Sequence, residues 1–165
     1  MKTQNKTARL ATTGIMIALA FILSRLEALL PPLTGIPGIK PGFANIVSMT
    51  ALYVLGPGPA ICISLVRVVL AGITFGSLSS MIYGLAGAAV SLSVMLLLKK
   101  LKCFSLPAIS IAGGTAHNLG QLLLACFVLG PSISVYLPVL VLSGAAAGFI
   151  TGIITALAVK ALPAS

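Results

Sequence analysis

The chain has 165 residues, of which 59% are hydrophobic and 7% are charged, and its mean hydropathy is +1.20. A soluble domain carries about a quarter charged residues, so this chain cannot cover itself with a surface that faces water. Its ten Lys or Arg residues stand against one acid, which excludes the carboxylate clusters of Mg²⁺-dependent prenyl or phosphoryl transfer and the carboxylate pair of a glycosidase. The chain has no P-loop, and its apolar body fits a membrane better than nucleic acid.

Apolar runs broken by proline, glycine and charge predict an all-α integral membrane protein, a bundle of about six transmembrane helices in one domain over residues 1–165. A spanning helix needs ~20 apolar residues. The expected spans are, in chain order, about 10–30, 43–55, 60–75, 79–98, 106–129 and 135–162. The second and third are shorter than a full crossing, so an alternative joins them into one hairpin that dips into the membrane and returns.

The distribution of cations predicts that both termini face the cytoplasm. With six spans, the inner segments hold seven cations, namely Lys2, Lys6, Arg9, Lys99, Lys100, Lys102 and Lys160. The outer loops hold only Lys40. Because cytoplasmic loops are enriched in Lys and Arg, this bias supports an even number of crossings.

Small residues recur at a spacing of four on the first span, where Gly14 precedes Ala18. Such rows let two helix backbones approach closely. The row either packs inside the bundle or forms a docking face for another membrane protein. On the sixth span, Gly144, Gly148 and Gly152 form a longer row, which we expect to pack within the bundle.

Four ionisable side chains lie inside the expected spans: Arg25, Glu27, Arg67 and His117. Such residues are costly in a bilayer and are therefore candidates for function. Arg25 and Glu27 are two residues apart and point to different helix faces. Glu27 pairs either with Arg67 or with Lys40. One interpretation is a single buried ion pair that holds helices together. In the other, spare cations in a cavity open to the outside bind an anionic or polar aromatic ligand.

The segment 31–42 contains four prolines and three glycines, so it cannot form a helix. It is also too apolar for a freely solvated loop. We expect either a structured cap over the outer end of the bundle or a plain connector between two helices.

The segment 113–121 on the fifth span is the most polar stretch of any span. His117 and Gln121 share one helix face, and Thr115 and Asn118 share another. Its glycines allow a neighbour or ligand to come close. We expect His117, Asn118 and Gln121 to line a cavity. Catalysis by His117 has no visible nucleophile, and the spacing of the three cysteines fits no metal site.

These features resemble the substrate-binding S component of energy-coupling-factor (ECF) vitamin transporters. A more specific resemblance, to the Gx transporter family, is carried by the segments 38–45, 72–76 and 113–121 together with Arg67. Members of that family are often labelled heptaprenyl diphosphate synthase component I. The chain has no Asp, so we expect no enzymatic activity and at most a non-catalytic role in prenyl chemistry.

The resemblance implies roles for particular positions. S components bind their substrate on the outer side under the first outer loop, which here is the segment 31–42. They dock a T component through small residues on the first helix, where Gly14 and Ala18 are the nearest match to the usual Ala-x-x-x-Ala. The candidate substrate-binding residues are Glu27, Lys40, Phe43, Asn45, Arg67, Tyr83, His117, Asn118 and Gln121. We expect no cofactor and no metal.

The leading expectation is the substrate-binding subunit of an ECF-type transporter in the bacterial cytoplasmic membrane, surrounded by lipid. It would capture a small polar, anionic or aromatic solute of the vitamin, flavin or quinone-precursor class from outside. A T component and two ATPase subunits would drive uptake. The alternative is a non-catalytic membrane subunit of a prenyl diphosphate or quinone pathway, or of an extracellular electron-transfer system. A third hypothesis is a membrane enzyme that acts through His117 and Glu27.

Overall fold

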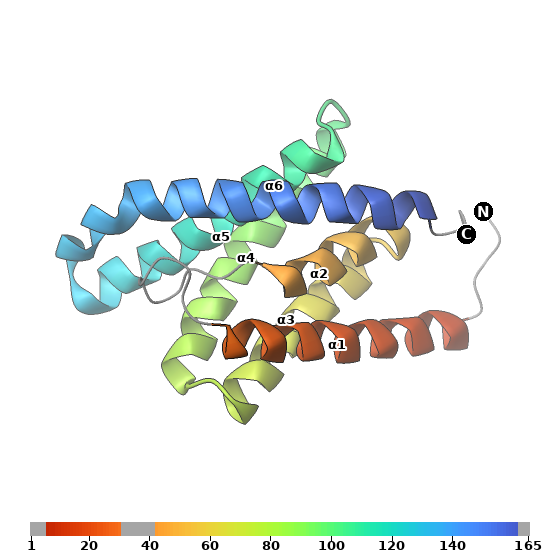
Figure 1. The fold of residues 1–165 in the computed structure, drawn as a ribbon, viewed down its shortest axis with the longest axis horizontal. Helices are drawn as coiled ribbons and strands as arrows, with labels where there is room; N and C mark the ends of the chain where they lie inside the picture. Colours follow the sequence, from red (N-terminus) through yellow and green to blue (C-terminus); the bar gives the residue numbers. More distant parts are fainter. Residues whose placement is uncertain (1–5, 31–41, 162–165) are drawn as a thin grey trace.

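The computed structural model describes residues 6–30 and 42–161, and these ranges are almost entirely helical. The elements are α1 (Lys6–Leu29), α2 (Phe43–Val54), α3 (Pro57–Thr74), α4 (Leu78–Leu101), α5 (Leu106–Leu129), the 3₁₀ helix η1 (Pro131–Tyr136) and α6 (Leu137–Ala161). No strand occurs in the described ranges, so the predicted all-α bundle of six helices is confirmed. The start of α1 and the end of α6 lie at the same end of the bundle (Figure 1).

Turn chemistry explains where the helices begin. Gly42 and Gly56, which precede α2 and α3, have φ angles of +83° and +91°, a region that favours glycine. The Ser77 side chain accepts a hydrogen bond from the Ser80 amide and caps α4. The predicted limits of the helices lie within a few residues of the observed ones. The main difference follows Gly130, where η1 precedes α6.

Five segments in the described ranges are long and apolar enough to cross a membrane. They are α1, α3, α4, α5, and η1 together with α6. The remaining helix, α2, has 12 residues. At 1.5 Å per residue it is about 18 Å long, which is shorter than the hydrocarbon core of a bilayer. Of the two spans that the sequence predicts to be short, α3 is therefore long enough to cross the membrane, whereas α2 is not.

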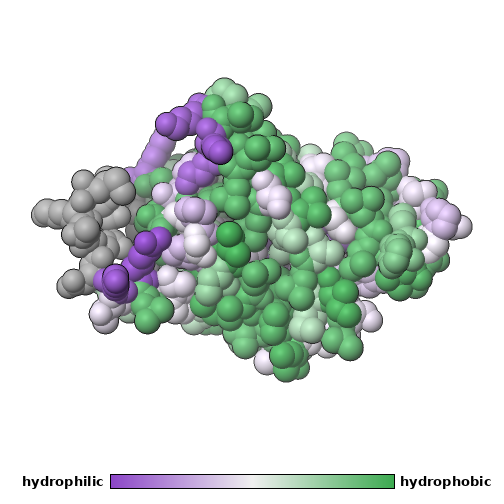
Figure 2. All heavy atoms as spheres, turned by 180° about the vertical axis from the view of Figure 1, so that it is seen from behind, coloured by the Kyte–Doolittle hydropathy of each residue, from purple (hydrophilic) through white to green (hydrophobic). Residues whose placement is uncertain are grey.

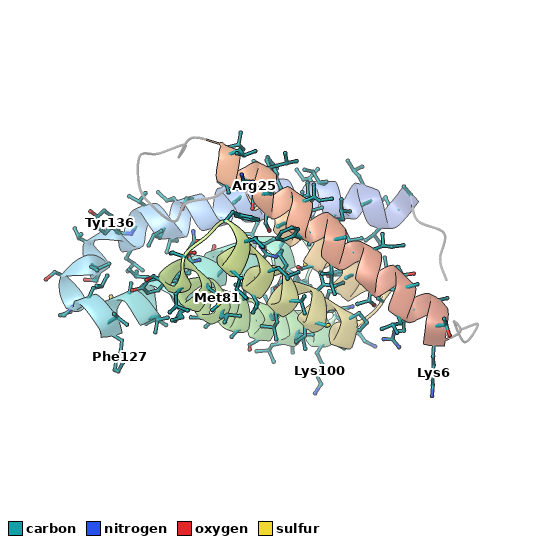
Figure 3. The ribbon with its side chains drawn as sticks, turned by 90° about the horizontal axis from the view of Figure 1, so that it is seen from below. Lys6, Arg25, Met81, Lys100, Phe127 and Tyr136 are labelled. Atoms are coloured by element: carbon teal, nitrogen blue, oxygen red, sulfur yellow. The ribbon has the colours of Figure 1, made fainter. Side chains whose placement is uncertain are left out.

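The surface of the bundle is that of a multi-pass membrane protein. On the face seen in Figure 2, hydrophobic side chains cover most of the surface and hydrophilic ones gather towards one end. Lys6 lies at one end of the bundle and Phe127 and Tyr136 lie at the other, whereas Lys100 lies between them, nearer to Lys6 (Figure 3). The exposed apolar side chains include Phe127, at 89% exposure, which water would disfavour and lipid tails would accept.

Two cations bind the carbonyl end of α2. Arg9 donates from Nη2 to the Leu55 carbonyl at 2.8 Å. Lys99 donates from Nζ to the Leu52 carbonyl and lies 4.5 Å from the centroid of the Tyr53 ring. The last carbonyls of a helix have no partner within the helix and carry partial negative charge. These contacts allow the short helix α2 to end inside the protein.

Replacing Lys99 by methionine should therefore destabilise the bundle by about 1 kcal/mol, because the change removes a hydrogen bond at the end of α2 and a cation–π contact. Lys100→Met is the matched control, since Lys100 is exposed at the same helix end. The thermal unfolding midpoints of both variants in one detergent measure the difference. Equal midpoints would mean that the contacts of Lys99 do not support α2.

Glycines bring α5 close to α6 and to α4. A Cβ atom added at Gly148 of α6 would lie 2.5 Å from the Ser110 carbonyl oxygen of α5. One added at Gly120 of α5 would lie 2.9 Å from the Ala86 carbonyl oxygen of α4. Real Cβ atoms do not approach other atoms so closely. The predicted packing role of the glycine row on α6 is therefore confirmed.

Candidate functional site

A cavity of about 700 Å³ lies inside the bundle. All six α-helices and η1 contribute to its wall. Its volume falls in the range of about 300–1,000 Å³ that is typical of small-molecule sites. Tyr136 of η1 lines it, and Tyr136 lies at the end of the bundle opposite Lys6 (Figure 3). The cavity thus reaches from the interior towards the end away from the lysines.

Arg67 of α3 is the charged centre of one wall. Its Nη2 donates to Asn45 Oδ1 on α2 at 2.9 Å, and its Nη1 donates to Ser24 Oγ on α1 at 3.4 Å. The side chain is only 9% exposed. Within the described residues, its hydrogen-bond partners are neutral and its Nε has none. Three helices therefore position a buried cation whose hydrogen-bonding capacity is only partly used.

Glu27 of α1 lies on the same wall and is 7% exposed. Its Oε1 accepts a hydrogen bond from the backbone N–H of Phe43, the first residue of α2. The carboxylate also acts electrostatically on Arg67. A negative charge at the first turn of a helix is favourable, because the free N–H groups there carry partial positive charge. Glu27 thus joins α1 to the start of α2.

Arg25 lies outside this cavity. Its guanidinium carbon lies 5.2 Å from the centroid of the Phe75 ring, and the residue is exposed. Arg25 and Glu27 do occupy different faces of α1, as their spacing predicts. The hypothesis that the cations of this region share one cavity is wrong for Arg25, because stacking on Phe75 holds it at the surface.

A second polar cluster lies on α4 and α5. His117 Nε2 and Gln121 Nε2 are 3.1 Å apart, and both residues line the cavity with Tyr83 of α4. Gly87 of α4 leaves room for them, since a Cβ there would lie 2.9 Å from His117 Cε1. Because either nitrogen of the His ring can carry the proton, this cluster can donate or accept a hydrogen bond.

Asn118 also lines the cavity, and in addition it joins two helices. Its Nδ2 donates to the Leu140 carbonyl at 2.8 Å and to Ser143 Oγ at 3.3 Å, both on α6. These bonds use both amide hydrogens of the side chain. Asn118 therefore links α5 to α6 at the cavity wall.

Of the candidate substrate-binding residues that the structure describes, only Phe43 is not found in the cavity wall. Its backbone N–H donates to Glu27, which does line the cavity. Lys40 and the rest of residues 31–41 of the proposed cap lie outside the described residues. The pairing of Glu27 with Lys40 and the form of this segment therefore stay predictions from the sequence.

The predicted docking residues, Gly14 and Ala18, are both exposed on α1. Among the described residues, no atom lies within 4 Å of a Cβ added at Gly14. The row of small residues therefore does not pack inside the bundle. The sequence leaves open whether this row packs inside the bundle or forms a docking face. The structure favours the second interpretation, because the row is exposed on α1.

The sequence reasoning missed a set of hydroxyl and sulfur side chains in the cavity wall. These are Ser24, Ser48, Ser64, Ser80, Ser91, Ser110, Thr151, Met49, Met81 and Met95. Ser48 Oγ has no hydrogen-bond partner among the described residues, whereas Ser91 Oγ donates to the Gly113 carbonyl at 2.8 Å. A serine within an apolar helix is a weak signal, because it can bond to its own helix backbone. The described residues also contain no group of three His, Cys, Asp or Glu side chains that could hold a metal ion.

The helices and the cavity together define a multi-pass, all-α membrane protein with an internal site of small-molecule size. The sequence model of the family described as Heptaprenyl diphosphate synthase component I matches residues 16–158, so the chain belongs to this family. The match extends from α1 to α6 and includes every lining residue of the cavity. No curated protein and no solved structure matches the chain.

Proposed function

We propose that this protein is the substrate-binding membrane subunit of an ECF-type transporter in a bacterial cytoplasmic membrane. It captures a small polar, anionic or aromatic solute from outside and releases it inward when partner subunits hydrolyse ATP. The observation that carries the proposal is the cavity of about 700 Å³ with the buried Arg67 in its wall. A buried cation in a membrane protein is costly, and such residues commonly face substrate pathways.

The side of the membrane follows from the cations. Lys6 lies at one end of the bundle, Lys100 lies in the same half, and Tyr136 at the opposite end lines the cavity (Figure 3). The positive-inside rule assigns the lysine end to the cytoplasm. The cavity then approaches the outer surface, which suits capture from outside.

Partner subunits would supply the energy, because the chain has no P-loop. The exposed face of α1 with Gly14 and Ala18 offers a surface on which a T component could pack its own helix closely. Two ATPase subunits would bind to that T component. We propose no catalytic role for this chain. Glu27 is engaged by the start of α2, and His117 lies on a different wall beside Gln121.

Arg67→Ala should abolish retention of a co-purified solute without unfolding the bundle, because charge-assisted hydrogen bonds in a buried site are strong. Lys40→Ala should have the same effect if the first outer loop closes the site. Arg25→Ala is the matched control, since Arg25 is exposed and outside the cavity wall. Native mass spectrometry of protein extracted gently from its own membrane measures the bound solute. Normal retention in both the Arg67 and Lys40 variants would show that the cavity is not the binding site.

A second candidate is a non-catalytic membrane subunit of a prenyl diphosphate or quinone pathway, or of an extracellular electron-transfer system. The description of the matching family, Heptaprenyl diphosphate synthase component I, favours it. This candidate predicts co-purification with a soluble, Asp-rich synthase. Failure to recover such a synthase under gentle extraction would count against it.

A further inference from the structure

We infer that the captured solute carries a single carboxylate, which binds Arg67, and that the cavity rejects phosphate and diphosphate groups. This inference rests on the proposed function and names its solute class. It follows from four features of the site: the unused donors of Arg67, the engagement of Glu27, the position of Arg25 at the surface and the polar cluster of His117 and Gln121.

Arg67 has donors to spare. A guanidinium group has five N–H donors, and within the described residues Nη1 and Nη2 each make one hydrogen bond, to Ser24 and Asn45, so each keeps a second N–H for a ligand. The Nε has no partner among the described residues and is itself buried against the protein. The bond to Ser24 is long, at 3.4 Å. A buried charged donor without a partner is unfavourable. A carboxylate offers two oxygens in the geometry that fits two parallel N–H groups of arginine.

Glu27 does not take the place of such an anion at Arg67. Its Oε1 accepts the N–H of Phe43, where α2 begins, and the partial positive charge of the helix start stabilises the carboxylate. Arg67 is instead fixed by the neutral oxygens of Asn45 and Ser24. Glu27 thus lowers the total charge of the wall while leaving N–H groups of Arg67 for a ligand.

The charge count favours one negative charge on the ligand. Among the described residues of the cavity wall, Arg67 is the only Lys or Arg and Glu27 is the only carboxylate, so their charges balance. A carboxylate ligand adds one negative charge beside Arg67, whereas a phosphate or diphosphate adds two or more, and each additional uncompensated charge in a buried site is strongly unfavourable. The single carboxylate of the sequence cannot build a Mg²⁺ site to neutralise it.

The rest of the cavity lining suggests the rest of the molecule. It includes the apolar side chains Phe75 and Met81 as well as the His117–Gln121 cluster. Thioether and aromatic side chains pack well against aromatic rings. The solute is therefore an aromatic or largely apolar monocarboxylic acid, and a hydrogen-bonding group on its body would meet His117 and Gln121.

The test is a binding series on the full chain in lipid nanodiscs. The probes are benzoic, cinnamic and 4-phenylbutyric acids, their primary amides, and phenyl phosphate, which shares the ring but adds charge. We expect at least one acid to bind the wild-type protein about tenfold or more tightly than its amide and than phenyl phosphate, because the amide lacks the charge and phenyl phosphate exceeds it.

Arg67→Gln should remove the preference for acid over amide, and Arg67→Lys should retain part of it. Arg25→Gln, the matched control, should leave it unchanged.

The inference is overturned if the amides bind as tightly as the acids, if phenyl phosphate binds more tightly, if no acid binds the wild-type protein, or if Arg67→Gln keeps the preference. Should Arg67→Gln fail to fold, the wild-type comparison and Arg67→Lys decide the question. These outcomes are separate from the proposed function. A co-purified neutral solute would refute the carboxylate but leave solute capture in place, whereas a protein without any bound solute or transport partners would refute both.

Discussion

Replacing Gly148 by alanine is expected to lower the free energy of unfolding by about 1–3 kcal/mol, the usual cost of overpacking. The added Cβ would lie 2.5 Å from the Ser110 carbonyl oxygen and 2.8 Å from Ile111 Cα. Both atoms belong to the backbone of α5, which cannot turn away as a side chain would. The methyl group therefore forces α5 and α6 apart along the wall of the cavity. The thermal unfolding midpoint in detergent measures the loss.

Gly14→Ala is the matched control, because it adds the same methyl group to a helix. Among the described residues nothing lies within 4 Å of the new Cβ. Alanine favours a helix over glycine by up to ~1 kcal/mol, so this variant should be as stable as the wild-type protein or slightly more so. Equal midpoints for Gly148→Ala and Gly14→Ala would contradict the close contact of α5 with α6.

The double variant Gly14→Leu and Ala18→Leu is expected to lose at least nine-tenths of the co-purified T component while its own stability and solute binding stay unchanged. Both positions are exposed on α1, and among the described residues no atom lies within 4 Å of a Cβ at Gly14, so the larger side chains should be tolerated by the bundle but keep a partner helix at a distance. Recovery of the partner subunits with an affinity-tagged chain measures the effect.

A control for this surface is the double variant Ile15→Leu and Ile22→Leu. These side chains are exposed on the same helix, at 70% and 55%, and they keep their size when exchanged. Partner recovery should match that of the wild-type protein. If the Gly14 and Ala18 double variant also retains its full complement of partners, α1 is not the docking helix.

The helical architecture could be predicted largely from the sequence, because helices that cross a membrane appear in the sequence as long apolar runs. Apolar runs and their breaks at proline, glycine and charge give the helices, and the glycine row on α6 gives its packing face. The length of α2 could not be judged in this way. Its ends depend on distant partners, since Arg9 and Lys99 bind its last carbonyls and Glu27 binds its first N–H. Such contacts leave no local pattern.

Residues of the cavity wall could be predicted from the sequence where their side chains are ionisable, because such side chains are rare in a membrane helix. Arg67, Glu27 and His117 are rare in such helices, and the structure places all three in the wall. Arg25 is equally rare, but its contact with Phe75 comes from another helix, so its exposure could not be foreseen. The serines of the wall were missed, because a serine in an apolar helix is common whether it faces a cavity or a neighbouring helix.

The central claim is that the bundle captures a small solute for uptake driven by partner subunits. Native mass spectrometry of the protein purified gently from its own membrane tests this most directly, since it detects bound small molecules and partner chains together. We predict one small solute held by the wild-type chain, together with a T component and ATPase subunits. Recovery of a soluble prenyl synthase without any small bound molecule would contradict the claim and support the pathway-subunit alternative.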